Sequence, residues 1–215
     1  MKKTLSIILA MVLCIGVFTG CGAETTDANS SATKDAIKPL PETLDINALD
    51  NCTVAVSLSK GDVKTSDSGK TVINATVYSY ECYDMVDIAE LSEDDVIIRK
   101  NEEVKVTKLE RLDSGLVRIN GGEENGGFDL ISNDSTVYFE VGANDAKAYY
   151  ELGKAELSVS DEFEYVDASN EEAKTYHADD FLKEDSGIDY NFNPNNTSIV
   201  IENGTVIKMN KVYMP

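Results

Sequence analysis

Hydrophobic and polar residues alternate along most of this chain, with a period of two rather than the 3.6 of an α-helix. Val54, Val56 and Leu58 are separated by small polar residues, and the Val-, Thr- and Tyr-rich segment 72–80 resumes the pattern after the turn residues 60–69. Alternation of this kind, in residues that favour extended backbone, predicts a long β-hairpin.

The same reading predicts strands along the rest of the chain, connected mostly by short turns. Two segments, 84–91 and 178–183, instead predict short helical turns. The predicted fold class is therefore mainly β, an antiparallel barrel or sandwich with one or two short helices. The further predicted strands are 96–98, 104–112, 116–119, 128–131, 136–141, 155–160, 162–166, 198–202 and 205–213.

The last two strands carry the clearest hairpin signal, because Asn203-Gly204 lies between two alternating apolar runs. A long apolar strand at a chain end would be prone to aggregation if it were left unpaired. We therefore expect 206–213 to dock within a sheet and to be central to closure of the fold.

The first residues differ from everything that follows. Lys2 and Lys3 precede an apolar run at 7–18, and Phe18-Thr19-Gly20-Cys21 follows. A charged start, a short apolar run and small residues before a cleavage site are typical of a secretory signal peptide. The tetrapeptide resembles the lipobox of bacterial lipoproteins, which implies cleavage before Cys21 and a diacylglyceryl group on its sulfur.

The predicted organisation is a signal peptide at 1–20, a disordered tether at 21–38 and a single mainly-β extracytoplasmic domain at 39–215. The chain would be held by its acyl chains at the cell membrane, facing the extracellular side. The alternatives are plain secretion or an uncleaved anchor, since the uncharged stretch 4–23 is just long enough to span a bilayer.

Charge narrows the set of partners. Loss of Lys2 and Lys3 with the signal peptide leaves 17 basic and 39 acidic residues, a net charge of −22. A surface this acidic repels phosphate backbones, so no nucleic-acid partner is expected. The expected partners are the lipid bilayer, through acylated Cys21, and an extracellular protein or glycan.

The hairpin register bears on the two remaining cysteines, since Cys14 leaves with the signal peptide. A turn centred near Asp67 predicts the cross-strand pairs Val54 with Tyr80, Val56 with Tyr78 and Cys52 with Cys82. Cys52 and Cys82 would then either form a disulfide outside the cell or stay as two buried free thiols.

One loop is a candidate ligand site. Asn120-Gly121-Gly122 and Asn125-Gly126-Gly127 flank two acids, and the glycines permit positive φ, which predicts a tightly folded loop. Calcium would be the best-suited metal for such oxygen donors. However, no EF-hand spacing occurs, and no resident cofactor or other metal site is expected. The candidate ligand residues are Asn120, Glu123, Glu124, Asn125 and Asp129.

The sequence carries only weak signals for catalysis or for glycan binding. His177 is the single histidine and has no nucleophile pattern near it, so a surface position is expected. The 39 acids leave room for a carboxylate pair, but their abundance makes any one pair uninformative. The tyrosines that would serve a glycan are equally suited to cross-strand packing. They are Tyr78, Tyr80, Tyr83, Tyr149 and Tyr150.

The mature region also resembles a group of uncharacterised lipoproteins from gut-dwelling Gram-positive anaerobes. The resemblance implies no activity. The stretches that carry it are Val77-Tyr78-Ser79-Tyr80 with Tyr83-Asp84-Met85-Val86-Asp87, Ile119-Asn120-Gly121-Gly122 with Gly126-Gly127-Phe128-Asp129-Leu130, and Ile201-Glu202-Asn203-Gly204 with Tyr213-Met214-Pro215.

We therefore expect a surface-tethered binding or accessory protein rather than an enzyme. The alternatives are a carboxylate-dependent enzyme acting on glycan or cell wall, and a protein-binding inhibitor or envelope-stress protein. An enzyme of that kind needs a cleft with two convergent acids of raised pKa. A glycan binder needs tyrosines on one face, and a protein binder needs an exposed apolar patch.

Overall fold

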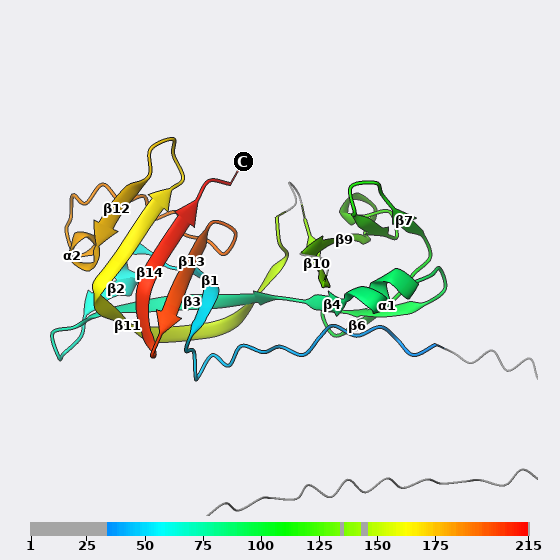
Figure 1. The fold of residues 1–215 in the computed structure, drawn as a ribbon, viewed down its shortest axis with the longest axis horizontal. Helices are drawn as coiled ribbons and strands as arrows, with labels where there is room; N and C mark the ends of the chain where they lie inside the picture. Colours follow the sequence, from blue (N-terminus) through cyan, green and yellow to red (C-terminus); the bar gives the residue numbers. More distant parts are fainter. Residues whose placement is uncertain (1–33, 134–135, 143–145, 215) are drawn as a thin grey trace, which may run out of the picture. The chain divides into compact units, whose positions relative to one another are not determined.

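The alternating segments of the sequence form strands throughout the computed structural model, which describes residues 34–133, 136–142 and 146–214 (Figure 1). The predicted mainly-β fold with two short helices is confirmed for these residues. The elements are β1 Cys52–Ser57, β2 Val63–Thr65, β3 Thr71–Tyr80, β4 Cys82–Asp84, α1 Met85–Glu90, β5 Val96–Arg99, β6 Glu102–Lys105, β7 Leu109–Arg111, β8 Val117–Ile119, β9 Phe128–Asn133, β10 Val137–Val141, β11 Tyr149–Ala168, β12 Lys174–His177, α2 Ala178–Phe181, β13 Thr197–Glu202 and β14 Thr205–Val212.

Five strands close into a barrel in the order β1-β3-β11-β14-β13, with β13 pairing back to β1. The long strand β11 makes this closure, since its first half pairs with β3 and its second half with β14. The β11–β14 pair is parallel, and the other barrel pairs are antiparallel. This is the connectivity of the OB-fold, which by itself implies no function.

The C-terminal strand has the role expected of it. β14 lies between β11 and β13 in the barrel wall, and the turn at Asn203-Gly204 has positive φ at both residues, as an Asn-Gly hairpin turn requires (Figure 1). The segments 155–160 and 162–166, in contrast, belong to one strand rather than two. β11 continues through them: it changes partner from β3 to β14 at Ser158, and a register shift between Val159 and Glu164 follows.

The register of the β1–β3 pair differs by one residue from the prediction. Val56 pairs with Val77, and Ala55 pairs with Tyr78. The connection is not a simple turn: a 3₁₀ turn at Lys60–Asp62 and the short strand β2 occupy it. Since a one-residue shift reverses which faces meet, the valines of both strands point into the barrel and Tyr78 lies on the outer face.

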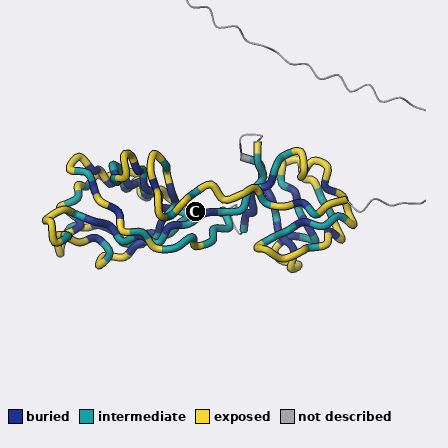
Figure 2. The backbone as a smooth tube through the Cα atoms, turned by 90° about the horizontal axis from the view of Figure 1, so that it is seen from below, coloured by how far each residue is buried: buried dark blue, intermediate teal, exposed yellow. Residues whose placement is uncertain are grey.

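A second sheet is built from residues between β3 and β11, with the order β4-β10-β9-β8-β7, accompanied by the β5–β6 hairpin and α1. Its apolar side chains form their own cluster around Tyr83, Ile97 and Phe128, separate from the cluster inside the barrel. One sizeable core was expected, and the described residues form two. Figure 2 shows how buried and exposed positions alternate along the strands that enclose them.

The tether predicted at 21–38 extends too far along the chain, because its last residues belong to the fold. Ile37 is buried, its N–H donates to the Val96 carbonyl at 2.8 Å, and its carbonyl accepts from Ile98 N–H at 2.7 Å. Lys34 pairs with Asp95 at 2.9 Å. Residues 34–38 are therefore part of the fold. A single apolar residue among polar ones has no periodicity by which a strand contact can be predicted.

Gly127 is the described glycine at which an added Cβ atom would have least room. A Cβ atom there would overlap the carbonyl oxygen of Ile119 and lie 2.8 Å from the carbonyl carbon of Asn120. Gly127→Ala should therefore destabilise the protein by about 3 kcal/mol, because backbone rather than a flexible side chain would have to move. Urea unfolding followed by circular dichroism measures this change.

Gly61→Ala is the matched control, because a Cβ atom at Gly61 meets nothing within 4 Å. Its stability should stay within about 0.5 kcal/mol of the parent. Equal stability of the two variants would contradict the close approach at Gly127.

Candidate functional site

The barrel register gathers tyrosines on one outer face. Ser198, Ala55 and Tyr78 are cross-strand partners on β13, β1 and β3, so their side chains point to the same side of the wall. Tyr80 is paired in the same way with Tyr149 of β11. Directly paired residues in neighbouring strands are close enough for their side chains to touch. This face therefore carries two rows, one through Ser198, Ala55 and Tyr78 and one through Tyr80 and Tyr149.

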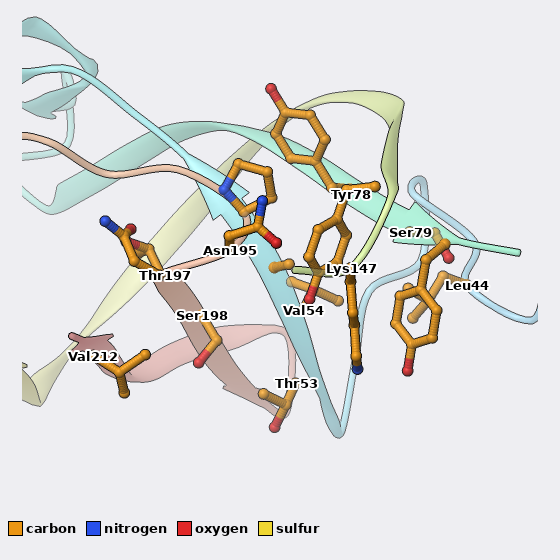
Figure 3. Close-up of a pocket in the computed structure, with 15 residues that line it drawn as sticks. Leu44, Thr53, Val54, Tyr78, Ser79, Lys147, Asn195, Thr197, Ser198 and Val212 are labelled. Carbon is orange, nitrogen blue, oxygen red and sulfur yellow. The ribbon is translucent and has the colours of Figure 1, made fainter. Parts of the chain in front are cut away.

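A cavity of about 340 Å³ opens over this face. Its wall comes from residues 53–55 of β1, 78–80 of β3 and 194–198 at the start of β13, closed by Lys147 and Tyr149 (Figure 3). Leu44 and Val212 complete it. This volume is at the lower end of the range that small-molecule sites occupy.

The cavity is free of carboxylates. None of the residues that line it is Asp or Glu, although the chain has 39 of them in 215 residues. Its polar groups are instead phenol, hydroxyl and amide groups from tyrosine, serine, threonine and asparagine, with one lysine. In a protein of this charge, such a lining marks a local environment that differs from the rest of the surface.

Lys147 is held by aromatic rings. Its Nζ lies 4.1 Å from the ring centroid of Tyr80 and 4.8 Å from that of Phe139. The Tyr80 ring in turn meets Phe139 and Tyr149 edge-on, at centroid distances of 5.5 and 5.6 Å. Within the described part of the chain Lys147 has no ion pair. The two rings attract its ammonium through their quadrupoles.

The segment before β13 forms a rigid edge of the cavity. The Asn196 amide accepts from Asn193 N–H at 3.0 Å and from the Thr197 hydroxyl at 2.5 Å, and donates to the Asn191 carbonyl at 3.0 Å. Both Asn196 and Thr197 are buried. Their polar groups are therefore committed to the loop, which fixes the position of the neighbouring Asn195.

Five polar groups at the cavity make no side-chain hydrogen bond to any other described residue. These groups are available to a ligand or to water. They are the hydroxyls of Thr53, Tyr80, Tyr149 and Ser198 and the amide of Asn195. Burial raises the pKa of the Tyr149 phenol, so this group stays protonated and can donate.

A second cavity of about 720 Å³ shares Leu44, Thr53, Ser79 and Tyr80 with the first. Here the Tyr150 hydroxyl donates to Glu42 Oε2 at 2.7 Å. Burial would raise the pKa of Glu42, but hydrogen bonds from Ser79, from the Leu44 N–H and from Tyr150 outweigh it, so the pKa is lowered. Burial and the bond to Glu42 raise the pKa of Tyr150 to about 12. This carboxylate is therefore an ionised acceptor.

The candidate ligand loop is a tight turn, as predicted, with positive φ at Asn120, Gly121, Gly122 and Gly126. The Asn120 amide is used inside the fold: its oxygen accepts from the N–H groups of Thr107 and Lys108, and its nitrogen donates to the Lys105 carbonyl. The side chain thus joins the loop to the segment before β7.

The other residues of that loop are also drawn into the structure. Asp129 pairs with Arg118 at 3.0 Å, and the Asn125 amide donates to the Gly121 carbonyl at 2.8 Å. Glu123 and Glu124 lie on a 3₁₀ turn. Among the described residues no three His, Cys, Asp or Glu side chains are placed to share a metal ion, so calcium remains a prediction without a described site.

The predicted pairing of Cys52 with Cys82 is wrong in its register. Cys52 pairs with Ile201 in the barrel, whereas Cys82 pairs with Phe139 in the second sheet, and both are free thiols. Burial is the main cause that raises the pKa of each thiol. The extra turn between β1 and β3 is the physical reason, since it moves the pairing by one residue and β3 ends before Cys82.

His177 and Tyr83 make hydrogen bonds within the fold and do not line the first cavity. The His177 N–H donates to Asp180 Oδ2 at 2.8 Å at the start of α2, and its ring faces the Phe163 carbonyl at 3.4 Å. Tyr83 is fully buried in the second cluster and donates to the Ile98 carbonyl. Of the five tyrosines named from the sequence, Tyr78, Tyr80 and Tyr149 line the first cavity and Tyr150 the second.

The carboxyl groups with a shifted pKa all have it lowered, within the described ranges. Each is held ionised by hydrogen bonds or by a cation. A general acid for glycoside hydrolysis would instead need a raised pKa. The groups concerned are Glu42, Asp95, Glu140, Asp167, Asp180 and Asp189.

The state of the cysteines is directly testable. Peptide mapping without reduction should find no Cys52–Cys82 disulfide, because the two residues lie in different sheets. Both thiols should react slowly with iodoacetamide at neutral pH, since their raised pKa leaves little thiolate. Reaction in urea provides the fast reference rate. A mapped 52–82 bond would contradict the described strand pairing.

Because of Glu140, we expect the stability of the protein to fall at low pH. It makes two hydrogen bonds to Arg99, at 2.8 and 2.6 Å. Burial would raise the pKa of Glu140, but Arg99 outweighs it and the pKa is lowered. The carboxylate therefore stabilises the fold above the ordinary glutamate range of about pH 4–5, and this contribution is lost as pH falls through the lowered folded value.

Glu140→Gln should cost about 1–3 kcal/mol at pH 7, and the difference from the parent should shrink as the pH is lowered. Urea unfolding at a series of pH values measures both. Glu103→Gln, at an exposed residue, is the control and should stay near the parent. A Glu140→Gln curve parallel to that of the parent would count against the ion pair as the source.

Within the described residues no helix is long and apolar enough to cross a membrane. Comparison with protein-family models, with curated protein sequences and with solved structures finds no match to this chain.

Proposed function

We propose that this chain is a lipid-anchored extracytoplasmic protein whose folded domain binds a ligand and catalyses no reaction. The observation that carries the anchoring is Phe18-Thr19-Gly20-Cys21, placed directly after a charged start and an apolar run. A diacylglyceryl group on Cys21 supplies two acyl chains, and two chains anchor a protein stably where one binds only marginally.

The binding role is supported by the tyrosine-lined cavity. It combines rings, unpaired hydroxyls and a fixed loop edge in one concave place, as small-molecule sites do. The acidic mature chain, with its net charge of −22, places its carboxylates elsewhere. A surface of this charge also keeps the domain hydrated and away from anionic lipid heads.

The two alternatives have less support. A carboxylate-dependent enzyme requires a raised carboxyl pKa in a cleft, whereas Glu42, the carboxylate hydrogen-bonded beside the larger cavity, has a lowered one. For a protein-binding inhibitor, the relevant feature is the run Val212, Tyr213 and Met214, which is exposed at the end of β14. This run is short, and no further argument identifies a partner for it.

Cys21→Ala tests the proposal. The parent chain should sediment with membranes and incorporate a labelled fatty acid, and the variant should lose the label and be released or mislocalised. Cys14→Ala, inside the predicted signal peptide, is the matched control and should keep both properties. Unchanged membrane association of a correctly cleaved Cys21→Ala chain would overturn the anchoring.

A further inference from the structure

We infer that the cavity over β1, β3 and β13 is a binding site for a short uncharged saccharide. The inference rests on the proposed binding function and names the ligand class for the same cavity. Three independent features of the lining carry it: the rings, the hydrogen-bonding groups and the distribution of charge.

The rings supply a surface for the apolar face of a sugar. Tyr78, Tyr80 and Tyr149 line the cavity and are half-buried, so part of each ring is open to it. The edge-on packing of Tyr80 against Tyr149 and Phe139 fixes the orientation of that ring before any ligand arrives. Tyrosine suits this role because its apolar ring carries a polar hydroxyl at one end.

The hydrogen-bonding groups match a ligand rich in hydroxyls. Thr53 and Ser198 present hydroxyls from neighbouring strands, and Asn195 presents an amide from the rigid loop edge (Figure 3). A sugar hydroxyl both donates and accepts, and hydroxyl and amide side chains also do both. These three groups have no hydrogen-bond partner among the other described side chains, so a ligand would displace only water.

Charge selects an uncharged ligand. A cation would find no carboxylate in the lining. An anion would meet the field of a mature chain with net charge −22, and Lys147, whose ammonium lies over two rings, is the single cation in the lining. An uncharged polar ligand avoids both costs.

The position of the cavity does not follow from the fold. In OB-folds, ligands bind across the second and third strands and the loops that join strands one to two and four to five. Here those loops are the 58–70 connection and the Asn203-Gly204 turn. The cavity lies at the opposite strand ends, where Ser198 and Tyr78 flank Ala55.

Saturation-transfer NMR tests the inference on the full-length chain in a detergent without a sugar headgroup. The probes are the glucose and N-acetylglucosamine trisaccharides, with trigalacturonate as the charged counterpart. We expect transfer to an uncharged trisaccharide and none to trigalacturonate. Asn195→Ala should weaken the binding by roughly threefold to tenfold, as for the loss of one hydrogen bond.

A blocking variant locates the site. Ala55→Phe places a ring in the cavity from the outer face of β1, without entering the barrel core, and should abolish the transfer. Thr76→Phe is the matched control, since Thr76 is on the same face of β3 but does not line the cavity. Its transfer should equal that of the parent. Thermal unfolding of both variants shows whether the fold is kept.

Each other outcome overturns the inference. No transfer to any uncharged trisaccharide rejects the ligand class, equal transfer with Ala55→Phe and Thr76→Phe rejects the location, and preference for trigalacturonate rejects the charge argument. Membrane association, measured on the same preparations, depends on Cys21 and not on Ala55. Failure of the saccharide inference is therefore distinguishable from failure of the proposed anchoring.

Discussion

The structure of the barrel depends on one constraint, the double pairing of β11. A single strand of 20 residues pairs with β3 through Tyr149–Ser158 and with β14 from Ser158 onward, which joins the two ends of the sheet. Closure fixes the register of every pair in the ring, because no barrel strand has a free edge along which to slip. The inward side of each strand is thereby set, and with it the outward side that carries Ala55, Tyr78 and Ser198.

Nine of the seventeen described lysines and arginines have an acidic partner. Arg99 pairs with Glu140, Arg118 with Asp129, and buried Lys211 with Asp189 at 2.6 Å. Seven of the fourteen described lysines have no described carboxylate within ion-pair distance. Lys147 is such a residue, and two aromatic rings hold it instead.

The alternation of the sequence predicts most of the strands because most of them have one buried side. It misses the short strands β2, β4 and β12, and it predicts one strand at 104–112 where β6 and β7 belong to different sheets. The alternation does not predict features that depend on residues far apart in the sequence. The β1–β3 register depends on a 3₁₀ turn and on β2, and the continuity of β11 depends on a change of partner at polar residues. Tyr78, Tyr80 and Tyr149 can be named from the sequence, since they are aromatic residues in strands. Asn195, Ser198 and Lys147 cannot, because only closure of the barrel brings them to the same place.

Anchoring and a small open cavity complement each other physically. A site of about 340 Å³ with few hydrogen-bonding groups gives modest affinity for one sugar unit. A glycan presents many such units, and acylation through Cys21 would hold many copies of the domain on one surface. Once one copy has bound, the neighbouring sites meet the same polymer at high effective concentration, so weak contacts add to strong retention without any further contact in each site. In this arrangement the acyl chains provide the strong attachment to the membrane. The cavity then needs selectivity for its ligand rather than high affinity.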